Sequence, residues 1–218
     1  MSRFPILFED GEALVIDKPA GMPVDRPKRG GTSLEDHLED LKLNFHRPPW
    51  IVHRLDQDTS GCLLLARNPK AVKRFAQAFQ NRLVEKRYVG IVAGTLAEEA
   101  GTIDLALSKV STKEEGWRMI ADLAGKPSVT HWRKLSESGG NTLVEFRPET
   151  GRTHQIRIHA LAGLGSPLLG DPVYGDGGTA PRTMLHGSSI TMTRDNKPPI
   201  AATSPMPDDF RALGFADG

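Results

Sequence analysis

Short apolar segments separated by turns rich in Gly and Pro run through most of the 218-residue chain. Some of these segments alternate apolar and polar residues, and others are continuously apolar, as expected for half-buried and buried strands. Few helical stretches interrupt them, and most connections are short. This pattern favours a largely antiparallel α+β fold. The expected strands are 6–8, 13–17, 51–55, 62–66, 87–93, 102–107, 129–135, 142–147 and 184–192.

Three segments have the spacing of helices. Thr32 and Glu35 match a capping box and open a first helix. Asn68 as N-cap and Pro69 at the first helical position start a second. A third, short helix is expected over 153–163. The apolar stripe of the first helix is Leu34, Leu38 and Leu41, and that of the second is Val72, Phe75, Ala76, Phe79 and Leu83.

The remaining segments have no clear periodicity. Residues 108–127 are polar and predict a loop or a hairpin, and residues 165–181 are rich in Gly and Pro and predict a loop. The tail from Pro198 is expected to wrap the surface. Neither internal repeats nor a linker-like composition occur, so a single domain over residues 1–218 is expected.

Composition limits the class of protein. Hydrophobic residues make up 38% and charged residues 25% of the chain, which excludes a disordered chain, and no apolar run approaches membrane-spanning length. Acidic residues follow the N-terminus too closely for a signal peptide. The one cysteine, Cys62, lies in an apolar run and is expected to be a core residue rather than a nucleophile. Together these features predict a cytoplasmic protein.

Positive charge is concentrated in one region although the net charge is only +1. Between residues 65 and 90 stand seven basic side chains and a single acid, Glu85. A basic face of this kind indicates either a binding site for a polyanion or an ordinary solvated helix face. The basic residues are Arg67, Lys70, Lys73, Arg74, Arg82, Lys86 and Arg87.

The segment His53-Arg54-Leu55-Asp56-Gln57-Asp58-Thr59-Ser60-Gly61 places polar groups between two apolar runs. Asp56 is expected at a strand end, where its side chain would be placed rigidly. Asp58 fits a turn acid that caps nearby backbone. Asp56 and Asp58 could also form a glycosidase pair, but such pairs usually come from separate segments.

A second polar motif, Gly151-Arg152-Thr153-His154-Gln155-Ile156-Arg157-Ile158-His159, carries two histidines and two arginines. On a helix the two histidines, five residues apart, diverge too far to bind one metal ion, so hydrogen-bonding or core histidines are expected. Arg157 lies among residues that look buried. A buried arginine needs an anion, either a carboxylate or a phosphate.

Two further features have weaker signals. Gly170-Asp171-Pro172-Val173-Tyr174-Gly175 has glycines at phosphate-loop spacing but lacks the Lys and Ser or Thr of such a loop, so the glycines are expected to serve tight turns. Tyr88 stands at the start of a strand beside the basic helix. It could stack on a base or pack in the core.

Taken together, these motifs resemble the RluA-like family of RNA pseudouridine synthases. The resemblance rests on VHRLDQDTSG at 52–61, KRYVGIVAG at 86–94, GRTHQIRIH at 151–159 and GDPVYG at 170–175. DKPAGMPV at 17–24 and LHG at 185–187 match more weakly, and the likeness runs from about residue 6 to 193.

The resemblance implies a bent, mainly antiparallel mixed sheet flanked by helices, with a central cleft for RNA. It implies isomerisation of uridine to pseudouridine without cofactor or metal, in a ribosomal or transfer RNA stem-loop. Asp56 matches the catalytic aspartate, Tyr88 the tyrosine that stacks on the target base, and Arg157 the basic residue paired with the aspartate. The predicted RNA-binding residues are Arg54, Lys70, Lys73, Arg74, Lys86, Arg87, Arg152 and His154.

The chain departs from the family pattern at Ser166, where the family often has His, and at Ser128, where Ala is common. It starts at the catalytic domain, so recognition is expected to come from that domain without an N-terminal RNA-binding module. A monomer with no membrane and no obligate protein partner is expected. Two alternatives stay open: an RNA-binding or folding-assistance protein without activity, and a glycoside or nucleoside hydrolase that uses Asp56 with Asp58.

Overall fold

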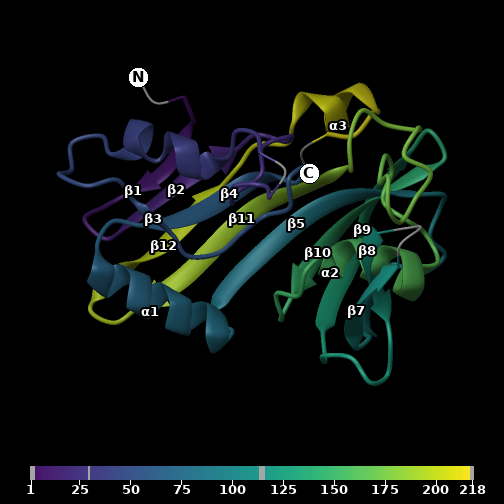
Figure 1. The fold of residues 1–218 in the computed structure, drawn as a ribbon. Helices are drawn as coiled ribbons and strands as arrows, with labels where there is room; N and C mark the ends of the chain where they lie inside the picture. The colour runs from purple at the N-terminus through teal and green to yellow at the C-terminus, as the bar shows by residue number, and fades with distance from the viewer. Residues whose placement is uncertain (1–2, 29, 113–115, 217–218) are drawn as a thin grey trace. The chain divides into compact units, whose positions relative to one another are not determined.

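The computed structural model describes residues 3–28, 30–112 and 116–216 (Figure 1). The chain divides into two compact units. The first unit contains Met1–Lys86 and Gly187–Pro205, and the second contains Arg87–His186 and Met206–Gly218. The expectation of a single domain stays a prediction.

The first unit is built on antiparallel strands. In its sheet β1, β2, β4 and β11 follow one another, β12 pairs with β11, and the short β3 pairs with β4. All seven residues of β4 are buried, which explains its continuously apolar sequence. The strands are β1 (Ile6–Glu9), β2 (Ala13–Lys18), β3 (Trp50–Ile51), β4 (Ser60–Ala66), β11 (Leu185–Arg194, whose first two residues belong to the second unit) and β12 (Lys197–Thr203).

Helix α1 (Pro69–Gln80) covers the core of this unit. The Asn68 side chain accepts a hydrogen bond of 2.9 Å from the Ala71 N–H, and Pro69 occupies the first turn, as the sequence predicts. Phe75 is fully buried and packs in one cluster with Leu64 and Ile190.

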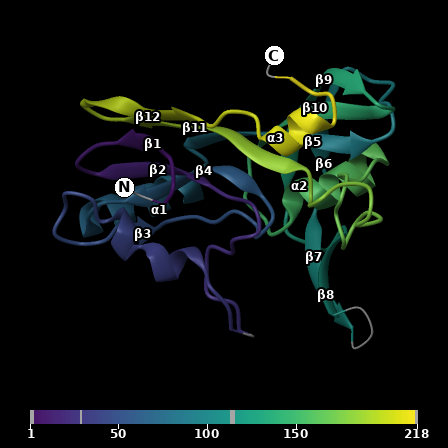
Figure 2. The same ribbon diagram turned by 90° about the horizontal axis from the view of Figure 1, so that it is seen from above.

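The second unit contains a four-stranded antiparallel sheet in the order β5, β10, β9, β6. Figure 2 shows β7 and β8 projecting from this unit as a separate hairpin, which confirms one of the two expectations for 108–127. The elements are β5 (Val84–Ala93, which begins in the first unit), β6 (Ala100–Asp104), β7 (Leu107–Thr112), β8 (Gly116–Ala121), β9 (Val129–Ser138), β10 (Asn141–Pro148), α2 (Gln155–Ile158), the π-helix η3 (His159–Gly163) and α3 (Asp208–Ala212).

The two faces of this sheet are covered differently. Phe146 of β10 packs on one face with Trp132 and with Ile156 of α2. Leu143 of the same strand packs on the other face with Phe210 of α3. The α+β class and the mainly antiparallel sheet are therefore confirmed.

Three local predictions are wrong. The first helix is two 3₁₀ turns, η1 (Leu34–His37) and η2 (Glu39–Leu41), and the capping box joins Ser33 to Asp36, one residue later than expected. The strand expected over 51–55 is only the two residues of β3, because a turn follows directly. The tail from Pro198 forms β12 and α3, since β12 pairs with β11 and its prolines are tolerated in a strand outside the main ladder.

Candidate active site

Asp56 lies in a loop between β3 and β4 and is half-buried, with buried Leu55 before it. Its carbonyl accepts a 3.2 Å hydrogen bond from the Thr59 N–H, which closes a turn. The expectation that Asp56 stands at a strand end is wrong. The chain leaves β3 at Ile51, and this turn, rather than a strand, fixes the backbone at Asp56.

Lys18 anchors this loop from the end of β2. Its side chain is fully buried, and Nζ donates to the carbonyls of Pro19 at 2.8 Å, Met22 at 2.8 Å and Gln57 at 3.1 Å. The third of these bonds holds the residue next to Asp56. A buried ammonium is expensive unless its donors are satisfied, so the three carbonyls and the cation define one local arrangement. Lys18 was not predicted as part of the site, although it ends a mainly apolar strand.

Gly61 closes the loop where β4 begins. Its φ of +108° is one that side chains rarely adopt, and an added Cβ would lie 2.2 Å from the Gly187 carbonyl oxygen. Glycine at the last position of the HRLDQDTSG motif is therefore required by the close approach of the backbone at Gly187, the last residue of the LHG motif.

His53 connects the start of this loop to β4 and α1. Its Nε2 accepts a 2.9 Å hydrogen bond from the Leu64 N–H, and its ring stacks on Phe79 with centroids 4.5 Å apart. Burial lowers the pKa of His53 to about 3, so the ring is neutral at ordinary pH.

Burial also lowers the pKa of Lys86 to about 8. Cys62 is buried, and its pKa is raised to about 12 by burial, in agreement with a core residue rather than a nucleophile.

In the second unit, Arg157 is held by Asp171. Nε and Nη2 of Arg157 each donate a 2.6 Å hydrogen bond to a different oxygen of the fully buried Asp171 carboxylate. The guanidinium also lies 5.0 Å from the centroid of the Tyr174 ring. The buried arginine has the anion that the sequence required, and that anion is a carboxylate of the GDPVYG motif. Asp171 and Tyr174 were not predicted as site residues, because the glycines of their motif indicated only tight turns.

A buried chain of hydrogen bonds holds the helix that carries Arg157. The Gln155 amide nitrogen donates to Thr130 Oγ1 at 3.0 Å, so the Thr130 hydroxyl hydrogen is directed to Nδ1 of His159 at 2.9 Å. Nε2 of His159 then carries the proton and donates to Ser128 Oγ at 3.1 Å, and Ser128 donates to the Leu105 carbonyl at 2.5 Å. His159 is neutral in this arrangement, and burial lowers its pKa in the same sense.

His154 and Arg152 flank this helix. His154 has a left-handed backbone with φ of 52°, and its Nδ1 lies 2.9 Å from the Tyr174 hydroxyl, which also accepts from the Met119 N–H at 3.0 Å. Nε of Arg152 donates to the Pro127 carbonyl at 3.3 Å. Both histidines of the motif make hydrogen bonds, as the sequence predicts.

Tyr88 and Arg87 are neighbours on β5 and point to opposite faces of the sheet. Tyr88 is paired with Phe146 on β10 and packs against the cluster that contains Phe146 and Trp132. Nη1 of Arg87 lies 3.4 Å from Glu145 on the other face. Arg87 is therefore directed away from the Tyr88 face of the sheet.

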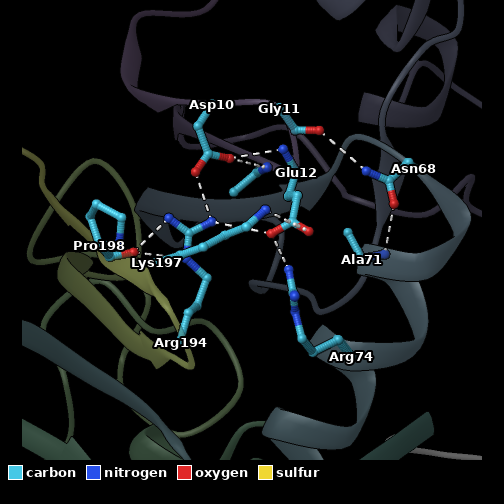
Figure 3. A network of polar contacts seen from close by, with 10 residues as sticks. Asp10, Gly11, Glu12, Asn68, Ala71, Arg74, Arg194, Lys197 and Pro198 are labelled. Carbon is cyan, nitrogen blue, oxygen red and sulfur yellow. Dashed lines mark hydrogen bonds and ion pairs between the residues drawn. The ribbon is translucent and has the colours of Figure 1, made fainter.

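Four of the predicted RNA-binding residues of the first unit differ in their surroundings. Lys70 and Lys73 of α1 are exposed. Arg74 instead joins a network in which Glu12 accepts from Arg74 and Lys197, while Arg194 contacts Asp10 at 2.7 Å (Figure 3). Arg54 is also exposed, and its Nη1 lies 2.5 Å from Asp25.

The predicted site residues are thus divided between the units. The first holds Asp56 with Arg54, Lys70, Lys73, Arg74 and Lys86, and the second holds Tyr88 and Arg157 with Arg87, Arg152 and His154. The pairing of Asp56 with Arg157 and the stacking role of Tyr88 stay predictions.

Two searches concern only the part of the chain that the structure describes. Within it, no group of three or more His, Cys, Asp or Glu side chains is arranged to hold a metal ion. Nor does any of its helices have the length and apolar character needed to cross a membrane.

Comparisons with known proteins agree with these motifs. The family model for RNA pseudouridylate synthase matches residues 12–162. An uncharacterised RNA pseudouridine synthase of Zymomonas mobilis is 51% identical over 212 residues, which cover 96% of this chain and 97% of that protein. Ribosomal large subunit pseudouridine synthase D of Nitrosomonas europaea is 40% identical over 95% of this chain, which spans 63% of that protein.

Solved structures give the same result for the fold. Human RNA Pseudouridylate Synthase Domain Containing 1 superimposes with a TM-score of 0.80 and 28% identity, covering 94% of this chain and 84% of that one. Human RNA Pseudouridylate Synthase Domain Containing 4 gives a TM-score of 0.78 with 25% identity, over 97% of this chain and 94% of that one.

Proposed function

Because the chain belongs to the RNA pseudouridylate synthase family, we propose that it isomerises specific uridines of ribosomal RNA to pseudouridine with Asp56 as the catalytic carboxylate. The observation that supports Asp56 most directly is its setting. It is half-buried, on a turn whose next residue is tied to the buried ammonium of Lys18. A carboxylate in such a setting is both accessible to a substrate and fixed in place.

The reaction breaks the N1–C1′ bond of uridine, turns the released base, and joins C5 to C1′. The hydrogen on C5 leaves as a proton, and N1 gains one, so the product is an isomer of the substrate. A stacked uridine is out of reach, so the nucleotide is flipped from its helix at a cost of a few kcal/mol. Asp56 acts in its ionised form, either as a nucleophile at C1′ or as a base at C2′.

Two residues of the second unit complete the proposal. Tyr88 stacks on the target base and offsets part of the cost of flipping. Arg157 favours the ionised form of Asp56 and orients it, because a cation within about 4–6 Å stabilises a carboxylate. These roles come from the resemblance of the motifs.

Large-subunit ribosomal RNA is the proposed substrate, because several relatives carry that substrate in their names. Transfer RNA is the alternative substrate. The proposal also includes action in the cytoplasm, supported by the single, buried and free cysteine Cys62, and action as a monomer.

The test measures tritium release from transcripts labelled at C5 of uridine, since forming the C5–C1′ bond expels that hydrogen. Unmodified large-subunit ribosomal RNA and transfer RNA transcripts serve as separate substrates. We expect release from the ribosomal transcript, its loss in Asp56→Asn, and its retention in the matched control Asp58→Asn. Release by Asp56→Asn would overturn the assignment. Free uracil in the products, with loss of activity in Asp58→Asn, would favour a hydrolase, and tight RNA binding with no product would favour a binding protein.

A further inference from the structure

Two arginines of the second unit are bound in nearly the same way. Arg157 donates through Nε and Nη2 to Asp171, and Arg182 donates through Nε and Nη2 to Asp209, with distances of 2.6 and 3.1 Å in the second pair. Each guanidinium also lies over an aromatic ring, at 5.0 Å from the Tyr174 centroid for Arg157 and at 5.5 Å from the Phe210 centroid for Arg182.

The two pairs differ in what else the carboxylate and the arginine do. Arg182 also donates to the carbonyls of Thr183 and Leu185, both at 3.1 Å, and so connects α3 to the start of β11. Asp209 remains 29% exposed. The Arg182 pair therefore has a structural task that its own contacts explain.

The Asp171 carboxylate is 0% exposed. Besides the two bonds to Arg157, its Oδ1 accepts from the backbone N–H of Val173 at 2.9 Å and of Tyr174 at 3.0 Å. The same oxygen thus fixes the guanidinium and the turn that places the Tyr174 ring against it. The Tyr174 hydroxyl is held in turn by His154 and Met119.

Bidentate binding through Nε and Nη2 leaves the guanidinium little freedom to rotate, because both bonds lie in its plane. The hydrogens of Nη1 are then directed to the side away from Asp171. A lysine at position 157 would provide the same charge but could not be held in a plane by two parallel bonds.

We propose that Asp171 is a positioning residue for pseudouridine formation: it fixes the plane of the Arg157 guanidinium, and with it the direction of the Nη1 donors, on which the role proposed for Arg157 depends. The inference rests on the proposed function and adds to it a residue that acts through Arg157 without touching the RNA. It assigns the GDPVYG motif to orientation of the catalytic cation rather than to a turn alone.

The experiment measures single-turnover tritium release with saturating enzyme on C5-labelled large-subunit ribosomal RNA transcript, together with RNA affinity. Asp171→Asn preserves the size of the side chain and can still accept from Val173 and Tyr174, but its amide cannot accept both arginine bonds. We expect the rate to fall about 100-fold, since a displacement of about 1 Å in a positioned group costs that much. RNA affinity should stay within about twofold, because binding draws on many phosphate contacts.

The matched control is Asp209→Asn, which breaks the other bidentate pair in the same unit. It should lower the melting temperature and leave the rate within about twofold of wild type, because Arg182 connects α3 to the start of β11 and the folded fraction is measured separately. A double-mutant cycle then separates positioning from general damage. On an Arg157→Gln background, Asp171→Asn should lower the rate no further than about twofold.

Arg157→Lys keeps the inference testable if Asp171→Asn does not fold. It retains the charge and loses the planar fork, so we expect a rate loss similar to that of Asp171→Asn. A wild-type rate in folded Asp171→Asn or in Arg157→Lys would overturn the inference, as would an equal loss from Asp171→Asn on the Arg157→Gln background. A wild-type enzyme that releases no tritium would instead count against the proposed function, so the two failures are distinguishable.

Discussion

The loop that carries Asp56 and the segment that carries Arg157 hold their charged residues by different means. The loop relies on a backbone turn, a close approach of two glycines and one buried ammonium that donates to three backbone carbonyls. The segment at 150–174 relies on side chains: Asp171 holds the guanidinium, and Gln155 and His159 hold the helix beneath it.

The role proposed for Asp56 gives a physical reason for the difference. A carboxylate that reacts with a substrate is best positioned by the backbone around it. A guanidinium has five N–H donors, so a carboxylate can hold one edge of it without using every donor. Substitutions in the two regions should therefore affect stability and turnover in different proportions.

The largest effect on stability is expected from Gln155→Ala in the helix segment. The Gln155 amide bonds Thr150, the Arg152 N–H, the Val129 carbonyl and Thr130, so its removal leaves several buried groups unsatisfied. We expect the free energy of unfolding to fall by about 3 kcal/mol. Urea denaturation measures it, with the exposed Gln77→Ala of α1 as the control, for which a change below about 0.5 kcal/mol is expected. Equal losses in both variants would show that the hydrogen bonds of Gln155 do not contribute to stability.

Lys18→Met tests the other side of the comparison. The substitution takes away the donor of three carbonyls but also removes a buried charge, so the loss of stability should be about 2 kcal/mol. Tritium release under conditions where the protein is folded should fall at least about tenfold, because the residue beside Asp56 loses its tether. Exposed Lys126→Met is the control and should change neither quantity. Full activity in folded Lys18→Met would show that the turn alone positions Asp56.

The pH dependence of stability should depend on His53. Its folded pKa, lowered to about 3, lies below the unfolded value near 6.5, so the unfolded state binds a proton that the folded state does not over this range. Stability is lost as pH falls from about 6.5 toward 3, by up to about 1.4 kcal/mol per pH unit from this group. Replacing the ring in His53→Gln should remove about one proton from the uptake on unfolding at pH 5. His159, whose pKa is also lowered, remains in the variant and supplies the residual slope. An unchanged slope would contradict the neutral, buried state of His53.

Periodicity and turn residues predicted most of the fold, but only part of the site. Strands and α1 were predictable because alternation, Asn68 and Pro69 are local signals. Arg157 was expected to need an anion, but its partner stands fourteen residues away in a turn whose acid has no periodicity to mark it. Lys18 was missed for a similar reason: its three acceptors are backbone carbonyls, which carry no signal in the sequence.

The smallest effects are expected on α1, where the same contrast between engaged and exposed cations recurs. Lys70 and Lys73 are exposed, whereas Arg74 is bound to Glu12 (Figure 3). If the helix faces RNA, Lys70→Ala with Lys73→Ala should reduce the slope of log affinity against log salt by about 1.5, because each phosphate contact contributes about 0.7 with a single strand and about 0.9 with duplex DNA. Arg74→Ala should leave that slope nearly unchanged and lower stability instead, because it breaks a contact of the network around Glu12. Filter binding from about 50 to 300 mM salt distinguishes the cases. A slope reduced by Arg74→Ala but not by the lysine pair would mean that RNA binding opens the network, and an unchanged slope in both would place the RNA elsewhere.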